Sequence, residues 1–186
     1  YDGRPILPLA SADDSGVVLY VGTLSKVLAP GPRVGYLVAS EPVLAAAAAI
    51  RFDFDRQGDA VGERALAELI EDGELQRHIW RTRRLYLARR DHCVEELRSR
   101  LGDVLDFAVP PGGLALWAKV SRDVPVAAWR AEAARRNVLI QAGSLFTFAH
   151  QDVQQVRIGY CGVTEKELST AVGRLRKAAD AVRERR

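Results

Sequence analysis

The sequence predicts an α/β fold built from short strands and amphipathic helices. Two apolar, β-branched runs near the start, residues 17–21 and 34–39, are typical of strands. A helical pattern fills most of residues 63–100, and the last third mixes four short apolar runs with two amphipathic helices. This mixture indicates that the chain ends in a two-layer α/β module.

The first third begins with a polar, turn-rich stretch over residues 1–16, which we expect to be a surface loop. The run at residues 17–21 is apolar throughout, which predicts a strand buried on both faces. Ser40 can cap a helix and Pro42 suits its first turn, so we expect a helix from there to about Phe52.

The middle of the chain is predominantly helical. The pattern over residues 63–100 is interrupted at Asp72 and Gly73, where we expect a turn. Residues 77–100 are rich in arginine, which we interpret as a solvated helix face with charge pairs one turn apart.

The last third alternates strands and helices. Apolar runs predict four strands, at residues 105–109, 114–120, 138–140 and 156–160. A helix is expected over residues 125–136, with Asn137 as a left-handed stop. The final helix should begin at Thr164, since Glu167 stands at capping-box spacing from it.

These elements suggest three parts. We predict that residues 1–52 form the edge of one sheet domain, residues 53–100 a helical connector and residues 101–186 a small α/β domain.

Composition excludes several classes of protein. The 186 residues are 48% apolar and 27% charged, which is globular composition. The net charge of +3 is spread along the chain without a block of like charges, so a nucleic-acid-binding surface is weakly supported. No apolar run reaches the ~18 residues of a spanning helix, and the start of the sequence has no signal-peptide pattern. We therefore expect no membrane partner.

Several chemically interesting residues receive ordinary structural interpretations. Cys93 and Cys161 fit neither a metal spacing nor a disulfide framework, which favours a reducing, cytoplasmic compartment. His150 has no ligand partner at metal spacing, and no metal site is expected. Trp117 and Trp129 are interpreted as core residues.

Lys26 differs from the other lysines because it directly follows a predicted strand. The hydroxyls of Thr23 and Ser25 precede it, and the guanidinium of Arg33 follows in the same loop. The other three lysines occupy positions typical of the surface: Lys119, Lys166 and Lys177. A lysine amine forms Schiff bases with carbonyl compounds, while hydroxyls, loop amides and an arginine can hold a phosphate dianion. That combination describes a pyridoxal phosphate site; spacing alone leaves open an ordinary loop lysine at a strand end.

Two other phosphate-binding motifs fit this loop poorly. Residues 22–26 have no glycine directly before the lysine, and no serine or threonine follows it, so the loop is not a P-loop. Residues 31–35 are not a dinucleotide-binding motif, because that motif needs a strand before it and a helix after it.

The whole stretch of residues 20–38, with its lysine, arginine, prolines and glycines in step, resembles the lysine segment of fold-type-I pyridoxal-phosphate aminotransferases. It is most similar to the aminotransferase-like domain of MocR-type regulators of the GntR family. Further resembling segments are residues 73–91, 111–117, 143–146 and 156–160. The resemblance runs from about Tyr1 to Ala179, and it implies the C-terminal part of such a domain: the edge of the large-domain sheet, connector helices and the small α/β domain.

The resemblance implies a role for each matched residue. Lys26 would bond covalently to the cofactor, and Thr23, Ser25 and Arg33 would hold its phosphate. Arg157 would bind the α-carboxylate of an amino-acid ligand. An arginine inside an apolar strand must be paired or face a cleft, which agrees with this role. An edge-strand arginine facing water is the alternative.

Some groups of the family's site precede the lysine strand: a carboxylate on the pyridine nitrogen, an aromatic ring stacked on the cofactor and further phosphate donors. Residues 1–5 resemble the stretch just after that carboxylate, and Asp2 is a poor substitute because its segment is turn-like. Since the first residue is Tyr1, we expect a portion of a longer protein, lacking its winged-helix DNA-binding domain and about half of the cofactor site.

The resemblance implies the effector-sensing domain of a MocR-type transcriptional regulator. Its partners would be an amino-acid or amine effector and a second subunit in a homodimer, and DNA would be bound only through a domain outside this chain. The alternative is a catalytic aminotransferase acting on an amino acid and a 2-oxo acid. Nothing in these residues separates regulator from enzyme, and a third hypothesis is a structural remnant that no longer binds cofactor.

Overall fold

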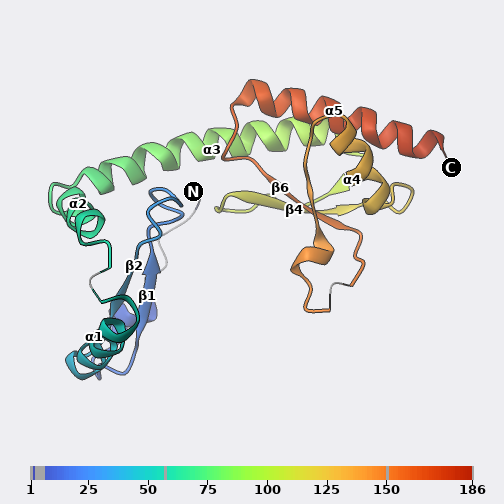
Figure 1. Cartoon of the computed structure of the whole chain (residues 1–186). Helices are drawn as coiled ribbons and strands as arrows, with labels where there is room; N and C mark the ends of the chain where they lie inside the picture. Colours follow the sequence, from blue (N-terminus) through green and yellow to red (C-terminus); the bar gives the residue numbers. More distant parts are fainter. Residues whose placement is uncertain (1, 3–6, 57, 150, 186) are drawn as a thin grey trace. The chain divides into compact units, whose positions relative to one another are not determined.

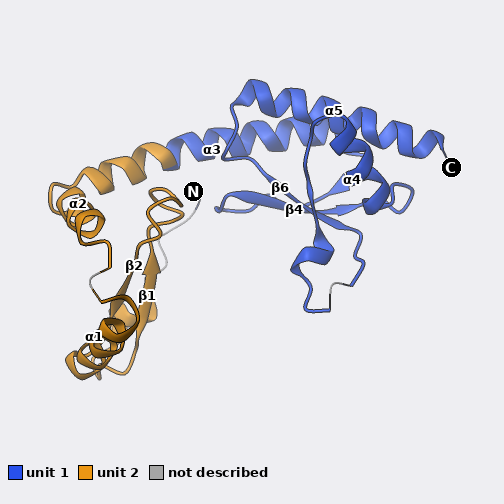
Figure 2. Ribbon diagram, viewed as in Figure 1, with its two compact units in different colours: residues 1–2, 83–186 blue, residues 3–82 orange. Residues whose placement is uncertain are grey.

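The computed structural model describes residues 2, 7–56, 58–149 and 151–185, and the chain divides into two compact units. One unit comprises residues 3–82, and the other comprises residues 1–2 together with 83–186 (Figure 2). Each contains helices and antiparallel strands, which confirms the predicted α/β class. The interpretations of residues 3–6 and His150 fall outside the described residues, and the three predicted parts stay a prediction.

The unit of residues 3–82 contains a two-stranded antiparallel sheet, in which β1 (Tyr20–Thr23) pairs with β2 (Gly35–Val38). The strand expected at residues 17–21 therefore begins three residues later. Its predicted burial on both faces is wrong, because β1 alternates half-buried and exposed positions and Val21 is exposed. A strand that pairs over four residues with one neighbour leaves part of its surface uncovered.

Three helices follow this sheet along the chain. They are α1 (Glu41–Asp55), α2 (Ala60–Glu71) and α3 (Glu74–Leu101), and a short 3-10 helix, η1 (Leu9–Ala12), precedes the sheet. Pro42 lies in the first turn of α1 as predicted, but the helix runs three residues beyond Phe52. Gly73 separates α2 from α3 at the predicted turn with a φ of +72°, a conformation that glycine adopts without steric cost. None of the helices in the described residues is long and apolar enough to span a bilayer.

The unit that contains residues 83–186 has a four-stranded antiparallel sheet in the order β3-β4-β6-β5 (Figure 1). Its strands are β3 (Leu105–Asp106), β4 (Ala115–Val120), β5 (Gln141–Ala142) and β6 (Gln155–Gly159). The run at residues 105–109 is a strand for two residues only, because its pairing with β4 ends at Asp106. The run at residues 138–140 precedes β5, because pairing with β6 starts at Gln141.

Two predicted helix boundaries in this unit are confirmed. Asn137, with a φ of +58°, follows α4 (Val126–Arg135) as its left-handed stop. Thr164 caps α5 (Glu165–Glu184): its hydroxyl accepts a hydrogen bond from the N–H of Glu167 at 3.3 Å, and the Glu167 carboxylate accepts one from the N–H of Thr164 at 2.7 Å. This reciprocal pair satisfies two N–H groups that the helix leaves unpaired.

The core of this unit lies between one face of the sheet and the helices α3, α4 and α5 (Figure 1). Strand residues that point into it include Leu116, Ala118, Val120, Val156 and Ile158. Trp129 of α4 has no exposed surface, as predicted for a core residue, and its indole N–H donates to the carbonyl of Leu175 in α5 at 3.0 Å. Side chains alternate along a strand, so the residues of β4 and β6 between these core positions lie on the opposite face of the sheet. We call this second face the open face.

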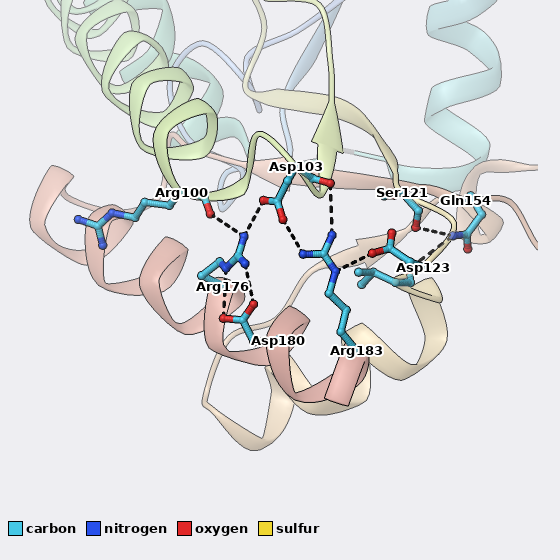
Figure 3. Close-up of polar contacts among 9 residues, drawn as sticks. Arg100, Asp103, Ser121, Asp123, Gln154, Arg176, Asp180 and Arg183 are labelled. Carbon is cyan, nitrogen blue, oxygen red and sulfur yellow. Dashed lines mark hydrogen bonds and ion pairs between the residues drawn. The ribbon is translucent and has the colours of Figure 1, made fainter. Parts of the chain in front are cut away.

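A charged network joins the end of α3 to α5 at the edge of this core (Figure 3). Arg176 Nη1 lies 2.6 Å from an oxygen of Asp103, and Arg183 bonds the other oxygen of the same carboxylate. Arg183 also donates from Nε to Asp123 at 2.6 Å, and Arg176 pairs with Asp180. Asp103 thus connects two arginines that stand two turns apart on α5, so the network resists separation of the loop from the helix.

We expect this network to make folding stability depend on pH. Hydrogen bonding from Arg183 lowers the pKa of Asp103 below its ordinary value of about 4. The stabilisation is therefore complete above that value and is lost as the pH falls through the lowered pKa. Asp103→Asn should reduce the free energy of unfolding by about 1 kcal/mol at neutral pH and flatten its decline in acid. Urea unfolding at several pH values measures both effects; Asp152→Asn, at an exposed carboxylate, is the control, and an unchanged pH dependence in Asp103→Asn would contradict the assignment.

Candidate functional site

The predicted lysine loop leaves and re-enters the two-stranded sheet at the same end. Thr23, the last residue of β1, stands opposite Gly35, the first residue of β2. The N–H of Leu24 donates to the carbonyl of Val34 at 3.1 Å, which extends the pairing by one step. Ser25, Lys26 and Arg33 therefore all belong to a closed loop whose two ends are fixed by backbone hydrogen bonds.

The turn that carries Lys26 is held by one buried side chain and two local hydrogen bonds. Leu24 is buried, and its carbonyl accepts from the N–H of Leu28 at 2.8 Å. The Thr23 hydroxyl accepts from the N–H of Ser25 at 3.2 Å. Lys26 lies inside this turn with an exposed side chain, so a fixed backbone presents its amine at the surface of the unit.

Arg33 is held in a left-handed backbone conformation, with a φ of +57°. Such a conformation costs a residue with a Cβ roughly 1 kcal/mol, and it recurs at sites where a ligand is bound. Arg33 directly precedes Val34, which pairs with Leu24, so its backbone lies beside the start of the lysine turn. The conformation places a charged side chain at the loop end where glycine would be the less strained choice.

These residues fit a phosphate-bearing aldehyde. Among the described residues, no carboxylate forms an ion pair with Lys26 or Arg33, and both side chains are exposed. The loop thus offers an amine, a guanidinium and two hydroxyls, those of Thr23 and Ser25. An arginine fork and hydroxyl donors suit a phosphate dianion, and a lysine amine suits an aldehyde carbon.

Replacing Arg33 by glycine should weaken phosphate binding while leaving folding stability nearly unchanged. In the full protein, we expect the free energy of unfolding to stay within about 1 kcal/mol, because relief of the left-handed strain offsets the backbone entropy of glycine. Affinity for pyridoxal phosphate should fall about tenfold or more, since a charge-assisted contact is lost. Arg33→Lys keeps the charge without the fork, so its affinity for pyridoxal phosphate should lie between those of the wild-type protein and Arg33→Gly in a fluorescence titration. Equal affinity in all three proteins would contradict the phosphate role.

Arg157, the predicted carboxylate-binding residue, belongs to the other unit. It lies at the centre of β6, opposite Trp117 of β4 and Gln141 of β5. Its side chain is half-buried on the open face of the sheet, and Nη1 donates to the amide oxygen of Gln141 at 2.7 Å. The structure thus brings Thr23, the lysine turn and Arg33 together in one loop, while Arg157 is placed by a separate sheet.

Two residues of this open face were misjudged or missed from the sequence. Trp117 was expected in the core, but 42% of its surface is exposed, and it meets Phe146 edge to face with ring centroids 5.6 Å apart. Since Leu116 and Ala118 point into the core, strand alternation puts Trp117 on the opposite face. Gln141 carried no sequence signal, because its contact with Arg157 depends on the pairing of β5 with β6.

Asp2 has a structural partner in its own unit. Its carboxylate pairs with the buried guanidinium of Arg90, which also donates to the carbonyl of Pro110 at 3.0 Å. The N–H of Asp2 donates to the carbonyl of Pro111 at 2.9 Å. Hydrogen bonding from Arg90 lowers the pKa of Asp2, so this carboxylate keeps its charge and fastens Asp2 to α3.

Comparison with known proteins identifies the family of the chain. Residues 2–175 match the family model of aminotransferase class I and II. An uncharacterized HTH-type transcriptional regulator of Bacillus subtilis, YisV, is 30% identical over 92% of the chain, and this stretch is 35% of the regulator. The probable rhizopine catabolism regulatory protein MocR of Rhizobium meliloti is 29% identical over 96% of the chain and 36% of its own length.

A solved structure has the same fold. The multiple substrate aminotransferase of Thermococcus profundus superposes with a TM-score of 0.86 at 25% identity, covering 100% of this chain and 46% of the enzyme. The chain therefore spans less than half the length of each of these proteins. The predicted resemblance is confirmed, and pyridoxal phosphate is the cofactor expected from the family match. The chain belongs to the family of class I and II aminotransferases, and its relatives include transcriptional regulators of the MocR type.

Proposed function

We propose that this chain is the ligand-sensing part of a MocR-type transcriptional regulator that binds pyridoxal phosphate. The observation that carries the proposal is the loop of residues 23–33, which offers an exposed lysine amine together with phosphate donors and no described carboxylate paired to either cation. The matching regulators supply the biological class, since YisV is named an HTH-type transcriptional regulator and MocR a probable regulatory protein.

Each residue has a defined role in this proposal. Bound pyridoxal phosphate supplies an aldehyde that condenses with amines and a ring that withdraws electrons. Lys26 binds the aldehyde carbon, and Thr23, Ser25 and Arg33 hold the phosphate. Arg157 binds the carboxylate of an amino-acid ligand and so selects amines that carry an acid group. Ligand binding then shifts the population of conformations, which changes DNA binding outside this chain.

An enzyme is the second candidate, because the matched solved structure is an aminotransferase. In that case Lys26 has one further role, since its amine, when displaced by the substrate, moves the proton at the substrate's Cα. The same loop and the same Arg157 serve both functions. The two candidates differ in the consequence of ligand binding, which is either a change in DNA affinity or turnover to a 2-oxo acid.

The experiment compares these two outcomes in the full protein loaded with pyridoxal phosphate. DNA binding to the promoter of its own gene is measured with and without a panel of amino acids and amines. In parallel, 2-oxo acid formation is measured with a 2-oxo acid acceptor present. We expect at least one ligand to change DNA affinity, and Lys26→Arg to remove that response. Steady turnover with unchanged DNA binding would favour the enzyme and overturn the regulator.

A further inference from the structure

The open face of the four-stranded sheet carries a row of three side chains across three strands. Arg157 stands in the middle, with Trp117 directly opposite on β4 and Gln141 directly opposite on β5. Side chains at opposed positions on one sheet face have Cβ atoms about 5 Å apart, so both neighbours are within reach of the guanidinium. Fold geometry therefore places Arg157 between an amide and an indole.

The contact on the β5 side leaves the charge of Arg157 uncompensated. The amide oxygen of Gln141 accepts one hydrogen bond from Nη1 at 2.7 Å. Within the described residues no carboxylate forms an ion pair with this guanidinium, whereas Arg176 and Arg183 both bind Asp103. A guanidinium has five N–H donors, so an amide partner orients it and leaves donors and charge for an anion.

On the β4 side, Trp117 stands opposite Arg157 in the strand register. Trp117 is fixed by its edge-to-face contact with Phe146, at a centroid separation of 5.6 Å and an interplanar angle of 83°. An aromatic pair of this geometry resists rotation of the indole. The hydrogen bond to Gln141 therefore orients the Arg157 guanidinium on the β5 side, while Phe146 fixes the indole of the residue that stands opposite on β4.

We propose that Gln141 is a positioning residue for carboxylate recognition: it orients the Arg157 guanidinium without neutralising it. This inference rests on the proposed function, in which an amine ligand binds beside Arg157. It makes the identity of residue 141 a determinant of how strongly the site prefers amines that bear a carboxylate. A glutamate at this position would occupy the guanidinium with an internal carboxylate, and a leucine would leave it unoriented.

The test uses two probes with the same side chain, L-phenylalanine and 2-phenylethylamine, which lacks the carboxylate. The full protein is loaded with pyridoxal phosphate, and each probe is titrated while the visible absorbance band of the bound cofactor is followed. The variants are Gln141→Leu and Gln141→Glu. Gln76→Glu, which makes the same charge change at an exposed position of α3, is the control, and thermal unfolding of each variant checks folding.

We expect the wild-type protein to bind phenylalanine more tightly than phenylethylamine. Gln141→Glu should weaken phenylalanine binding about tenfold or more, because one charge-assisted contact is replaced internally. Gln141→Leu should weaken it severalfold, and neither variant should change phenylethylamine binding. If Gln141 were purely structural, its variants would change the affinities for both probes by the same factor. A change in the ratio of the two affinities therefore indicates a positioning role.

Equal binding of the two probes to the wild-type protein would overturn the inference, as would Gln141 variants with an unchanged ratio. A parallel weakening of both probes in the variants would overturn it as well. Failure of the proposed function is seen separately, before any probe is added, as the absence of a cofactor band in the wild-type protein.

Discussion

Replacing Lys26 by alanine is expected to abolish the covalent attachment of pyridoxal phosphate to the protein. The wild-type protein should acquire a visible absorbance band on addition of the cofactor, and Lys26→Ala should show none. The reason is chemical: the bond to the aldehyde carbon needs a primary amine, and Lys26 is the amine that the closed loop presents beside Thr23, Ser25 and Arg33.

Two further variants distinguish loss of the covalent bond to the cofactor from loss of a positive charge. Lys26→Arg keeps a cation in the loop but has no amine that condenses with an aldehyde, so it should also lack the band while binding the cofactor phosphate noncovalently. Lys177→Ala removes an exposed lysine of α5 and should leave the band unchanged. A band of wild-type intensity in Lys26→Ala would show that another amine binds the cofactor.

Replacing Trp129 by alanine is expected to have the largest effect on stability. The side chain is fully buried between α4, α5 and the sheet, and its indole N–H donates to the carbonyl of Leu175. Truncation of a buried aromatic residue costs about 3–5 kcal/mol, and the unpaired carbonyl adds roughly 1 kcal/mol or more. A loss of this size approaches the total stability of many domains, so we expect the variant to unfold, at least in the unit that contains residues 83–186.

Urea unfolding followed by circular dichroism measures this effect. Trp129→Phe fills most of the volume but lacks the N–H, so it should fall between the wild-type protein and Trp129→Ala. Trp80→Ala is the matched control, because Trp80 lies on α3 with 59% of its surface exposed and should change stability by less than about 1 kcal/mol. A Trp129→Ala protein as stable as that control would show that α4 and α5 do not depend on this contact.

Local sequence signals predicted local structure well in this chain. The spacing of Thr164 and Glu167 predicted a capping box, and both of its hydrogen bonds are present. Asn137 and Gly73 were expected at turns, and both have a positive φ. Such features depend on neighbouring residues, so the sequence near them contains most of the information.

Features that depend on pairing between strands distant in the sequence were harder to predict from the sequence. The strand expected at residues 138–140 lies at Gln141–Ala142, since its position depends on the register with β6. Gln141 and Arg157 are 16 residues apart in sequence and meet because of that register. Trp117 was assigned to the core from its apolarity, although the alternation of β4 places it on the open face.

The candidate site shows the same contrast between features that local sequence predicts and features that depend on strand pairing. The loop with Thr23, Ser25, Lys26 and Arg33 could be proposed from spacing and resemblance, because all four residues lie within one short segment. The left-handed conformation of Arg33 had no sequence signal, as arginine is an unusual residue there. The partner of Arg157 could be found only once the strands were paired.

Chemical trapping of the cofactor shows which lysine binds it. The full protein is incubated with pyridoxal phosphate and reduced with sodium borohydride, which converts the carbon–nitrogen double bond to a stable secondary amine. The protein is then digested, and the modified peptide is identified by mass spectrometry. We expect a phosphopyridoxyl group on Lys26. Modification at Lys119, Lys166 or Lys177 instead, or no site-specific modification, would contradict it.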